Sequence, residues 1–210
     1  MGCISGSWRS PTAWTWIPMS RSKGRSPSNG GRGRRKKSAP EQAAPGADLG
    51  LRVGGWTLLF HPLLLDQFER VVSVAEKEKA KRKPGEPEGP NMKLAAAMRR
   101  IMLVDVPEDP SRPAYRQGGT LGEHLKHWLR AKFGNGRFRL FFRYRHDVKL
   151  IVFAWVNDSD SLRTYGSSTD AYAVFRRMLG AGNPPDEWEA LVDAASAPDA
   201  LRRSQGLFGA

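Results

Sequence analysis

Residues 132–144 read Lys-Phe-Gly-Asn-Gly-Arg-Phe-Arg-Leu-Phe-Phe-Arg-Tyr. The Asn-Gly pair supplies the positive φ angles of a two-residue hairpin loop, and the residues on either side alternate in polarity. With Asn135 and Gly136 as the loop, Phe133 pairs with Phe138, and the same register pairs Ala131 with Leu140 and Leu129 with Phe142. These apolar pairs share one face, so the stretch predicts an antiparallel hairpin whose apolar face packs on the hydrophobic core.

The opposite face of this hairpin is predicted to be basic and exposed. In the same register Lys132 lies across from Arg139, and such a like-charged pair is unfavourable unless an anion binds there. Cations hold phosphates and aromatic rings stack on splayed bases, so the face suits single-stranded RNA. The alternative is a charged face that only keeps the sheet soluble. The candidate RNA-binding residues are Lys126, Trp128, Arg130, Arg137, Phe141 and Arg143.

Two helices are predicted upstream of the hairpin. Residues 53–60 form a short strand, and apolar side chains from Leu64 to Ala75 then recur at helical spacing. The Pro- and Gly-rich residues 83–90 end this helix, and a second one runs through Leu94 and Met102 until Pro107 and Pro110.

A central strand and two further helices are predicted downstream. The run Leu150–Val156 is apolar on both faces, as in a strand covered on both sides. A helix that starts near Ser168 and stops at Gly180 buries Tyr172 and Phe175, and Pro184-Pro185 opens a last short helix through Val192. The expected fold class is α+β, with the N-terminal helices packed on a small antiparallel sheet and with C-terminal helices.

Three regions are expected along the chain. Residues 1–50 are rich in Ser, Gly, Pro and Arg, without apolar periodicity, and predict a disordered basic extension. Residues 51–197 form the domain, and residues 198–210 are expected to be a flexible tail. The extension holds 9 of the 34 basic and 2 of the 21 acidic side chains, which leaves 25 and 19 in the rest, so the domain itself is basic.

The composition favours a nucleic-acid partner and a cytoplasmic protein. The formal net charge of the 210 residues is +13, which attracts polyanions. The lone Cys3 excludes a disulfide framework, and no apolar run reaches the roughly 20 residues of a membrane span. We therefore expect a soluble protein without a membrane-spanning segment.

A polar loop after the central strand, residues 157–166, is the second candidate site region. It contains Asn157, Asp158, Arg163 and Tyr165. RNA cleavage by attack of the ribose 2′-hydroxyl requires proton transfer and stabilisation of a phosphorane, which Arg, Lys and Tyr can supply without a metal. The alternative is a loop built on Asp-based turns.

The sequence contains no motif for a metal site or for a catalytic nucleophile. His124 and His127 are expected to enter a strand, where a spacing of three places them on opposite faces and prevents chelation. No nucleophile elbow and no P-loop occurs in the sequence. No metal and no cofactor is expected.

The order of several motifs resembles the YhaV toxins. These motifs are residues 132–144, Trp-Val-Asn-Asp at 155–158, Leu-Arg-Thr-Tyr-Gly at 162–166, Thr-Asp-Ala-Tyr at 169–172 and Gly-Asn-Pro-Pro at 182–185. The resemblance covers about 140 residues and implies a RelE-like fold of the RelE and ParE group. It implies a metal-independent endoribonuclease toxin of a type II toxin–antitoxin system, which cuts mRNA, often at the ribosome, to inhibit translation. The implied partners are RNA, a PrlF-type antitoxin and, for the toxin–antitoxin complex, operator DNA.

The resemblance also implies roles for single residues. It assigns Arg139 to phosphate stabilisation, with Lys132 and Arg130 on the neighbouring strand, and makes Arg163 the second catalytic arginine. The tyrosine is either Tyr165, which lies in the better-matching motif, or Tyr172. Two other functions stay open: a non-catalytic module that binds RNA or DNA, and a ParE-like inhibitor of a DNA topoisomerase.

Overall fold

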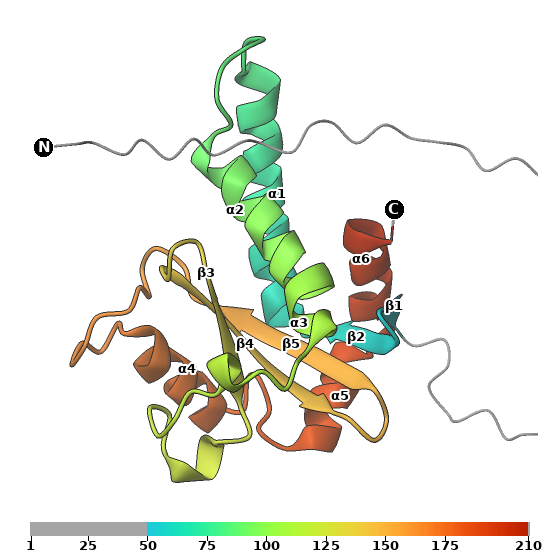
Figure 1. Ribbon diagram of the computed structural model, residues 1–210, viewed down its shortest axis with the longest axis vertical. Coiled ribbons are helices and arrows are strands. Elements are labelled where there is room, and N and C mark those ends of the chain that lie inside the picture. The colour runs from blue at the N-terminus through green and yellow to red at the C-terminus, as the bar shows by residue number, and fades with distance from the viewer. Residues whose placement is uncertain (1–49, 210) are drawn as a thin grey trace, which may run out of the picture. The chain divides into compact units, whose positions relative to one another are not determined.

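The computed structural model describes residues 50–209 as helices around one five-stranded sheet (Figure 1). Most of the extension predicted for residues 1–50 lies outside the described residues. The sheet has the order β1-β2-β5-β4-β3. Its strands are β1 (Leu51–Val53), β2 (Trp56–Phe60), β3 (Leu129–Phe133), β4 (Phe138–Arg145) and β5 (Leu150–Val156).

The predicted hairpin is confirmed in its register. β3 pairs with β4 antiparallel, with Phe133 opposite Phe138 and Lys132 opposite Arg139. Asn135 has a φ of 54° and Gly136 a φ of 77°, as the two-residue loop requires. β5 lies between β4 and β2 and is the predicted central strand, but it runs parallel to β2. The sheet is therefore mostly antiparallel with one parallel pair.

The helices follow the predicted order. His61 caps α1 through its Nδ1 atom, and Asp170 caps α4. The second helix passes through a π-helical turn and ends at Glu108, between the two prolines expected to stop it. The helices are α1 (Pro62–Lys81), α2 (Pro90–Arg100), the π-helical segment Ile101–Asp105, α3 (Val106–Glu108), α4 (Ala171–Gly180), α5 (Trp188–Ala195) and α6 (Pro198–Phe208), with 3-10 turns at Pro113–Tyr115 and Glu123–Leu125.

Apolar side chains are buried on both faces of the sheet. On one face α1, α2 and α6 pack over a core that includes Phe60, Phe142 and Phe153. On the other face α4 and α5 pack over a second core that includes Phe141 and Phe175. The α+β class is confirmed, and the sheet is the middle layer between two helical layers. No helix in the described part of the chain is long and apolar enough to span a membrane.

Two predictions near the C-terminus are wrong. Residues 198–208 form helix α6 instead of a flexible tail, because Phe208 is buried against Phe60 and Phe68, at ring distances of 4.5 and 4.9 Å. The helix α5 begins at Trp188, with Glu187 as its N-cap, and not at Pro184-Pro185.

Candidate active site

Three arginine side chains converge on the phenol ring of Tyr172, in the first turn of α4. Arg130 comes from β3, and its Nε donates a hydrogen bond of 2.7 Å to the Tyr172 hydroxyl. Arg139 comes from β4 and Arg163 from the loop before α4, and their Cζ atoms lie 5.9 and 4.8 Å from the centre of the same ring. We call these four residues the arginine cluster. The fold thus brings together side chains from two strands, a loop and a helix, and the most distant pair in the sequence, Arg130 and Tyr172, is 42 residues apart.

Arg139 is buried, and no carboxylate within residues 50–209 forms an ion pair with it. Its side chain is held by two carbonyl groups, because Nη1 donates to the oxygens of Gly136 and Arg137 at 3.2 and 3.4 Å. Only 6% of the residue is exposed, and its buried Nε has no hydrogen-bond partner in the described structure. A buried donor that lacks an acceptor carries an energetic cost, so the fold holds Arg139 in this position at the expense of stability.

Asn157 fixes the start of β4, which carries Arg139. Its Oδ1 accepts a 2.6 Å hydrogen bond from the backbone N–H of Arg139, and its Nδ2 donates to the Arg137 carbonyl at 3.2 Å. The residue is only 1% exposed. Asn157 therefore positions the arginine backbone from within and does not present its amide to solvent.

Asp170 ties the loop that carries Arg163 to the start of α4. Its Oδ2 accepts hydrogen bonds from the Arg163 guanidinium and from the Thr164 N–H, and its Oδ1 accepts from the Tyr172 N–H. Burial alone would raise the pKa of Asp170, but these hydrogen bonds hold it below the usual value. For Arg163 the directions are reversed: burial alone would lower its pKa, but the hydrogen bond and charge of Asp170 raise this pKa above the usual value. The loop is anchored at its end by this ion pair.

Tyr165 is the exposed tyrosine of the site. The Arg163 Cζ lies 3.7 Å from the centre of its ring, and 85% of the residue is exposed. Tyr172 is 5% exposed, so Tyr165 has the accessible hydroxyl and Tyr172 the buried one. Gly166, with a φ of 78°, allows the turn that follows Tyr165.

The cluster carries more positive than negative charge. Arg163 is paired with Asp170, whereas the hydrogen-bond partners of Arg130 are the Tyr172 hydroxyl and the Ala114 carbonyl. Lys132 adds a further exposed cation directly across the β3–β4 ladder from Arg139. Guanidinium groups without matching carboxylates are the groups that bind phosphate oxygens, often bidentately.

The predicted exposed basic face is wrong for three of its members. Trp128 and Phe141 are fully buried, so neither can stack on a base. The Arg143 guanidinium lies between the rings of Trp128 and Trp188, at 5.6 and 5.2 Å, and donates to the Asp186 carbonyl. The cause is the covering of this face by α4 and α5, which alternation within a hairpin cannot reveal.

The other members of that face lie at its margins. Lys126 precedes β3 and forms an ion pair with Glu123. Arg137 is exposed in the turn beside Arg139. The alternative of an Asp-based turn holds for Asp158, whose Oδ1 accepts from the N–H groups of Asp160 and Ser161 at 3.1 and 3.0 Å.

The two neighbouring histidines do not lie in a strand, contrary to prediction. His124 belongs to a 3-10 turn, and His127 contacts Asp186 at 2.8 Å before β3 begins. Asp186 also accepts from the Trp128 ring nitrogen at 2.7 Å, so the carboxylate organises the packing of α5. Within residues 50–209 no group of three His, Cys, Asp or Glu side chains could hold a metal ion.

Sequence reasoning missed the part that Asp170 plays. The sequence marked it only as the start of a helix, whereas the structure also makes it the counter-charge of Arg163. The signal that could have found it is the Arg-x-Tyr motif seven residues upstream of an N-cap. The sequence likewise gave no sign that Arg130 would donate a hydrogen bond to Tyr172. This contact joins β3 to α4, which are far apart in the sequence.

Comparisons with known sequences identify one family. A model of the YhaV toxin family, described as toxins with endonuclease activity of toxin–antitoxin systems, matches residues 58–196. The ribonuclease toxin YhaV of Escherichia coli K12 is 42% identical over 146 residues, which are 69% of this chain and 95% of that protein. The toxin YhaV of E. coli O6:H1 matches to the same extent. Among solved structures, a double arginine-to-alanine mutant of the E. coli toxin RelE in the free state covers 58% of this chain and 96% of its own, with 16% identity and a TM-score of 0.33.

Proposed function

The chain belongs to the YhaV family of toxins with endonuclease activity, which act in toxin–antitoxin systems, and on this premise we propose that it cleaves RNA at the arginine cluster. The observation that carries the proposal is the convergence of Arg130, Arg139 and Arg163 on Tyr172, with the buried Nε of Arg139 unpaired. RNA is also the substrate class in the name of the relative from E. coli K12.

In the proposed reaction the ribose 2′-oxygen attacks the adjacent phosphorus. The bond to the 5′-oxygen of the next nucleotide breaks, which leaves a 2′,3′-cyclic phosphate and a 5′-hydroxyl end. The 2′-hydroxyl must lose a proton and the leaving 5′-oxygen must gain one. Negative charge grows on the two free phosphate oxygens in between, and guanidinium groups fixed in advance stabilise it.

The residues divide these tasks by their position in the site and, for the two tyrosines, by their exposure. Arg139 and Arg163 are held rigidly, by backbone carbonyls and by Asp170, and would bind the phosphate oxygens. Tyr165 has the exposed hydroxyl next to Arg163 and would protonate the leaving oxygen. Lys132 is the candidate on the 2′ side, where its exposed cation would stabilise the 2′-oxygen as this oxygen loses its proton to water. Tyr172 would be a positioning residue, because its buried hydroxyl orients Arg130.

The family implies an antitoxin partner. We propose that this partner is of the PrlF type, encoded beside the toxin, and that it covers the basic cluster. We further propose that the target is mRNA in the cytoplasm, on or off the ribosome, and that the complex of toxin and antitoxin binds operator DNA. The net charge of +13 supports the two nucleic-acid partners, mRNA and operator DNA.

Induction of the full chain in a bacterial host tests the proposal. RNA 5′ ends would be mapped alongside growth for the wild type and for Arg139→Ala and Arg163→Ala. We expect growth arrest and new 5′-hydroxyl ends for the wild type, and neither for the two variants. The matched control is Arg202→Ala, which removes an exposed arginine on α6.

Two results would count against cleavage. Arrest without new RNA ends would favour topoisomerase inhibition, for which supercoiling assays are the next measurement. Cleavage in vitro that is unchanged by both substitutions would place the active site elsewhere. Accumulation of each variant has to be measured by immunoblot, because Arg139 is buried and its loss lowers stability as well.

A further inference from the structure

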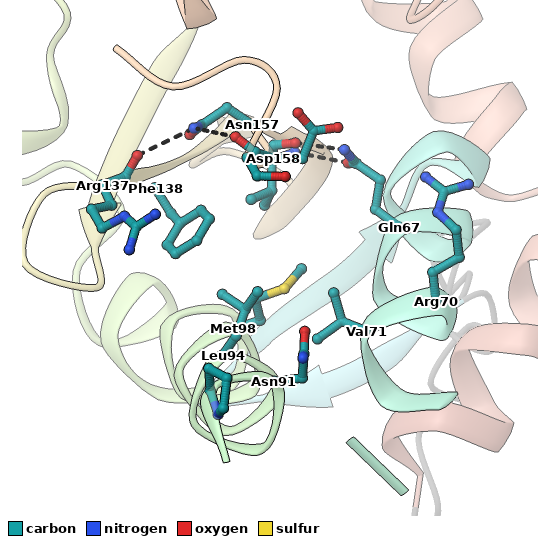
Figure 2. A pocket seen from close by; sticks show the side chains of 13 residues that line it. Gln67, Arg70, Val71, Asn91, Leu94, Met98, Arg137, Phe138, Asn157 and Asp158 are labelled. Carbon is teal, nitrogen blue, oxygen red and sulfur yellow. Dashed lines mark hydrogen bonds between the residues drawn. The ribbon is translucent and has the colours of Figure 1, made fainter. Parts of the chain in front are cut away.

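A cavity of about 440 Å³ opens on the other side of the turn that carries Arg137 (Figure 2). It lies between α1 and α2 and the adjoining ends of β4 and β5. This volume is within the range of small-molecule sites, about 300 to 1,000 Å³. Its floor is apolar and consists of Val71, Leu94, Met98, Phe138 and Val156.

Two amide side chains hold the walls of the cavity in place. Gln67 on α1 pairs with the backbone of Val156 like a further strand residue: its Nε2 donates to the Val156 carbonyl at 2.6 Å, and its Oε1 accepts from the N–H at 3.1 Å. Asn157 donates to the Arg137 carbonyl on the opposite side. The cavity is thus formed before any ligand enters, which reduces the entropic cost of binding.

The rim of the cavity carries two arginines. Arg70 and Arg137 line opposite sides, as Figure 2 shows, and both are exposed. The acid among the described lining residues is Asp158, whose Oδ1 is already occupied by its own turn. A ligand that is complementary to this rim carries negative charge near the two arginines and a hydrogen-bond donor near Asp158.

The cavity and the arginine cluster share a wall. Asn157 lines the cavity and also accepts the backbone N–H of Arg139. Arg137 lines it too, and its carbonyl accepts from the Arg139 guanidinium. The turn at Arg137 separates the two sites, so an RNA chain that occupies both would cross this turn.

We propose that the cavity binds one nucleotide of the RNA, next to the phosphate that is cleaved. The Phe138 ring, backed by Phe133 at 5.4 Å, offers a surface for the base, and Arg70 and Arg137 bind the flanking phosphates. Asp158 accepts from a base amino group, so the site favours adenine, cytosine or guanine over uracil. An aliphatic protein anchor would use the floor but would have no need of the two arginines. This inference rests on the proposed function.

The test is equilibrium binding of a labelled, eight-nucleotide 2′-O-methyl RNA, which cannot be cleaved through its 2′-oxygen. The full chain is compared with Arg70→Ala/Arg137→Ala, with Phe138→Leu, and with Arg100→Ala as an exposed arginine outside the cavity. We expect the double variant to weaken binding about tenfold and to reduce the slope of log K against log salt by about 1.4, for two phosphate contacts. Phe138→Leu keeps the apolar packing and is expected to weaken binding about tenfold through lost stacking. Arg100→Ala should bind like the wild type.

The outcomes separate this site from the proposed function. Cleavage of unmodified RNA by the wild type tests the function, whereas binding of the uncleavable RNA tests the cavity. Wild-type affinity and salt slope in both cavity variants would overturn the inference even if the enzyme cleaves RNA. If these variants keep RNA affinity but escape neutralisation by the antitoxin encoded beside the gene, the cavity is a protein-docking site and the inference is wrong. Urea unfolding of each variant shows whether a loss of affinity is a loss of fold.

Discussion

Tyr165 and Tyr172 both contact the guanidinium of Arg163, but Tyr165 is an exposed residue and Tyr172 a buried one. We expect Tyr165→Phe to lower the single-turnover cleavage rate by about 100-fold or more, as loss of a general acid does, without a change in Tm. Tyr172→Phe should lower the Tm, because the Arg130 Nε loses its acceptor, and should lower the rate by about tenfold.

A substrate with sulfur in place of the leaving 5′-oxygen gives the control for this prediction. A thiolate leaves without a proton, so such a substrate should restore most of the rate of Tyr165→Phe and none of that lost in Arg139→Ala. A larger rate loss in Tyr172→Phe than in Tyr165→Phe, with the same rescue, would transfer the role of acid to Tyr172.

At the residue scale, the sequence predicted the identity of the site residues better than it predicted their burial. Arg139, Arg163 and both tyrosines could be named from motifs, and they lie together in the structure. The burial of Trp128 and Phe141 could not be predicted, because alternation along β3 and β4 shows that two faces differ but not what covers each. A basic face beneath a helix and a basic face in solvent have the same sequence pattern.

The cap of α1 is an element whose stability depends on pH. His61 is 3% exposed, and its Nδ1 accepts the N–H of Leu63 at 3.3 Å. Burial lowers the pKa of His61 from 6.5 to about 4, against the opposing effect of the Asp66 charge. The folded protein therefore favours neutral His61, and its stabilisation is complete above pH 6.5 and is lost as the pH falls toward 4.

His61→Asn keeps a side chain that caps helices and removes the titration. Between pH 7 and pH 4 we expect the free energy of unfolding of the wild type to fall by about 3 kcal/mol more than that of the variant, because His61 takes up a proton near pH 6.5 when unfolded but only near pH 4 when folded. Urea unfolding followed by tryptophan fluorescence at pH 7, 5.5 and 4 measures the difference. Equal losses in both proteins would mean that His61 is protonated in the fold at little cost.

The helix α6 is expected to contribute to the stability of the domain. Phe208 lies against Phe60 and Phe68, and Arg203 pairs with Glu69 on α1 at 2.8 Å. Phe208→Ala should lower the free energy of unfolding by about 3 to 5 kcal/mol, because it empties a buried aromatic site. Leu201→Ala, at a half-buried position of the same helix, is the milder comparison. Denaturant unfolding that is unchanged by Phe208→Ala would show that α6 is not docked in solution.

At the scale of elements the sequence was right wherever the pattern is local. The hairpin register follows from Asn135-Gly136, and α1 and α4 follow from apolar spacing and caps. α6 was missed because its apolar positions, such as Leu207 and Phe208, are few and its helix begins directly after α5. The parallel pairing of β2 with β5 was missed because it joins segments about 90 residues apart.

At the scale of the whole molecule, the positive charge that attracts RNA is spread over the chain, whereas the residues proposed to cleave RNA lie in the domain alone. Residues 1–50 hold 9 of the 34 basic side chains, and the rest of the chain keeps a net charge of +6 with the complete arginine cluster. Removal of residues 1–49 should therefore weaken non-specific RNA binding but leave the cleavage rate at saturating RNA unchanged. If about four of the nine cations contact phosphates, the slope of log K against log salt falls by about 3.

Fluorescence anisotropy of a labelled RNA between 50 and 300 mM NaCl and single-turnover cleavage test this on the same protein preparations. A full-length variant with Ser at Arg34, Arg35, Lys36 and Lys37 separates loss of charge from loss of chain length, and its slope should lie between those of the wild type and the truncated chain. Equal slopes for all three would show that the extension does not contact RNA. A truncated chain that binds RNA but no longer cleaves it would place part of the active site before residue 50, in disagreement with the arginine cluster as the complete site.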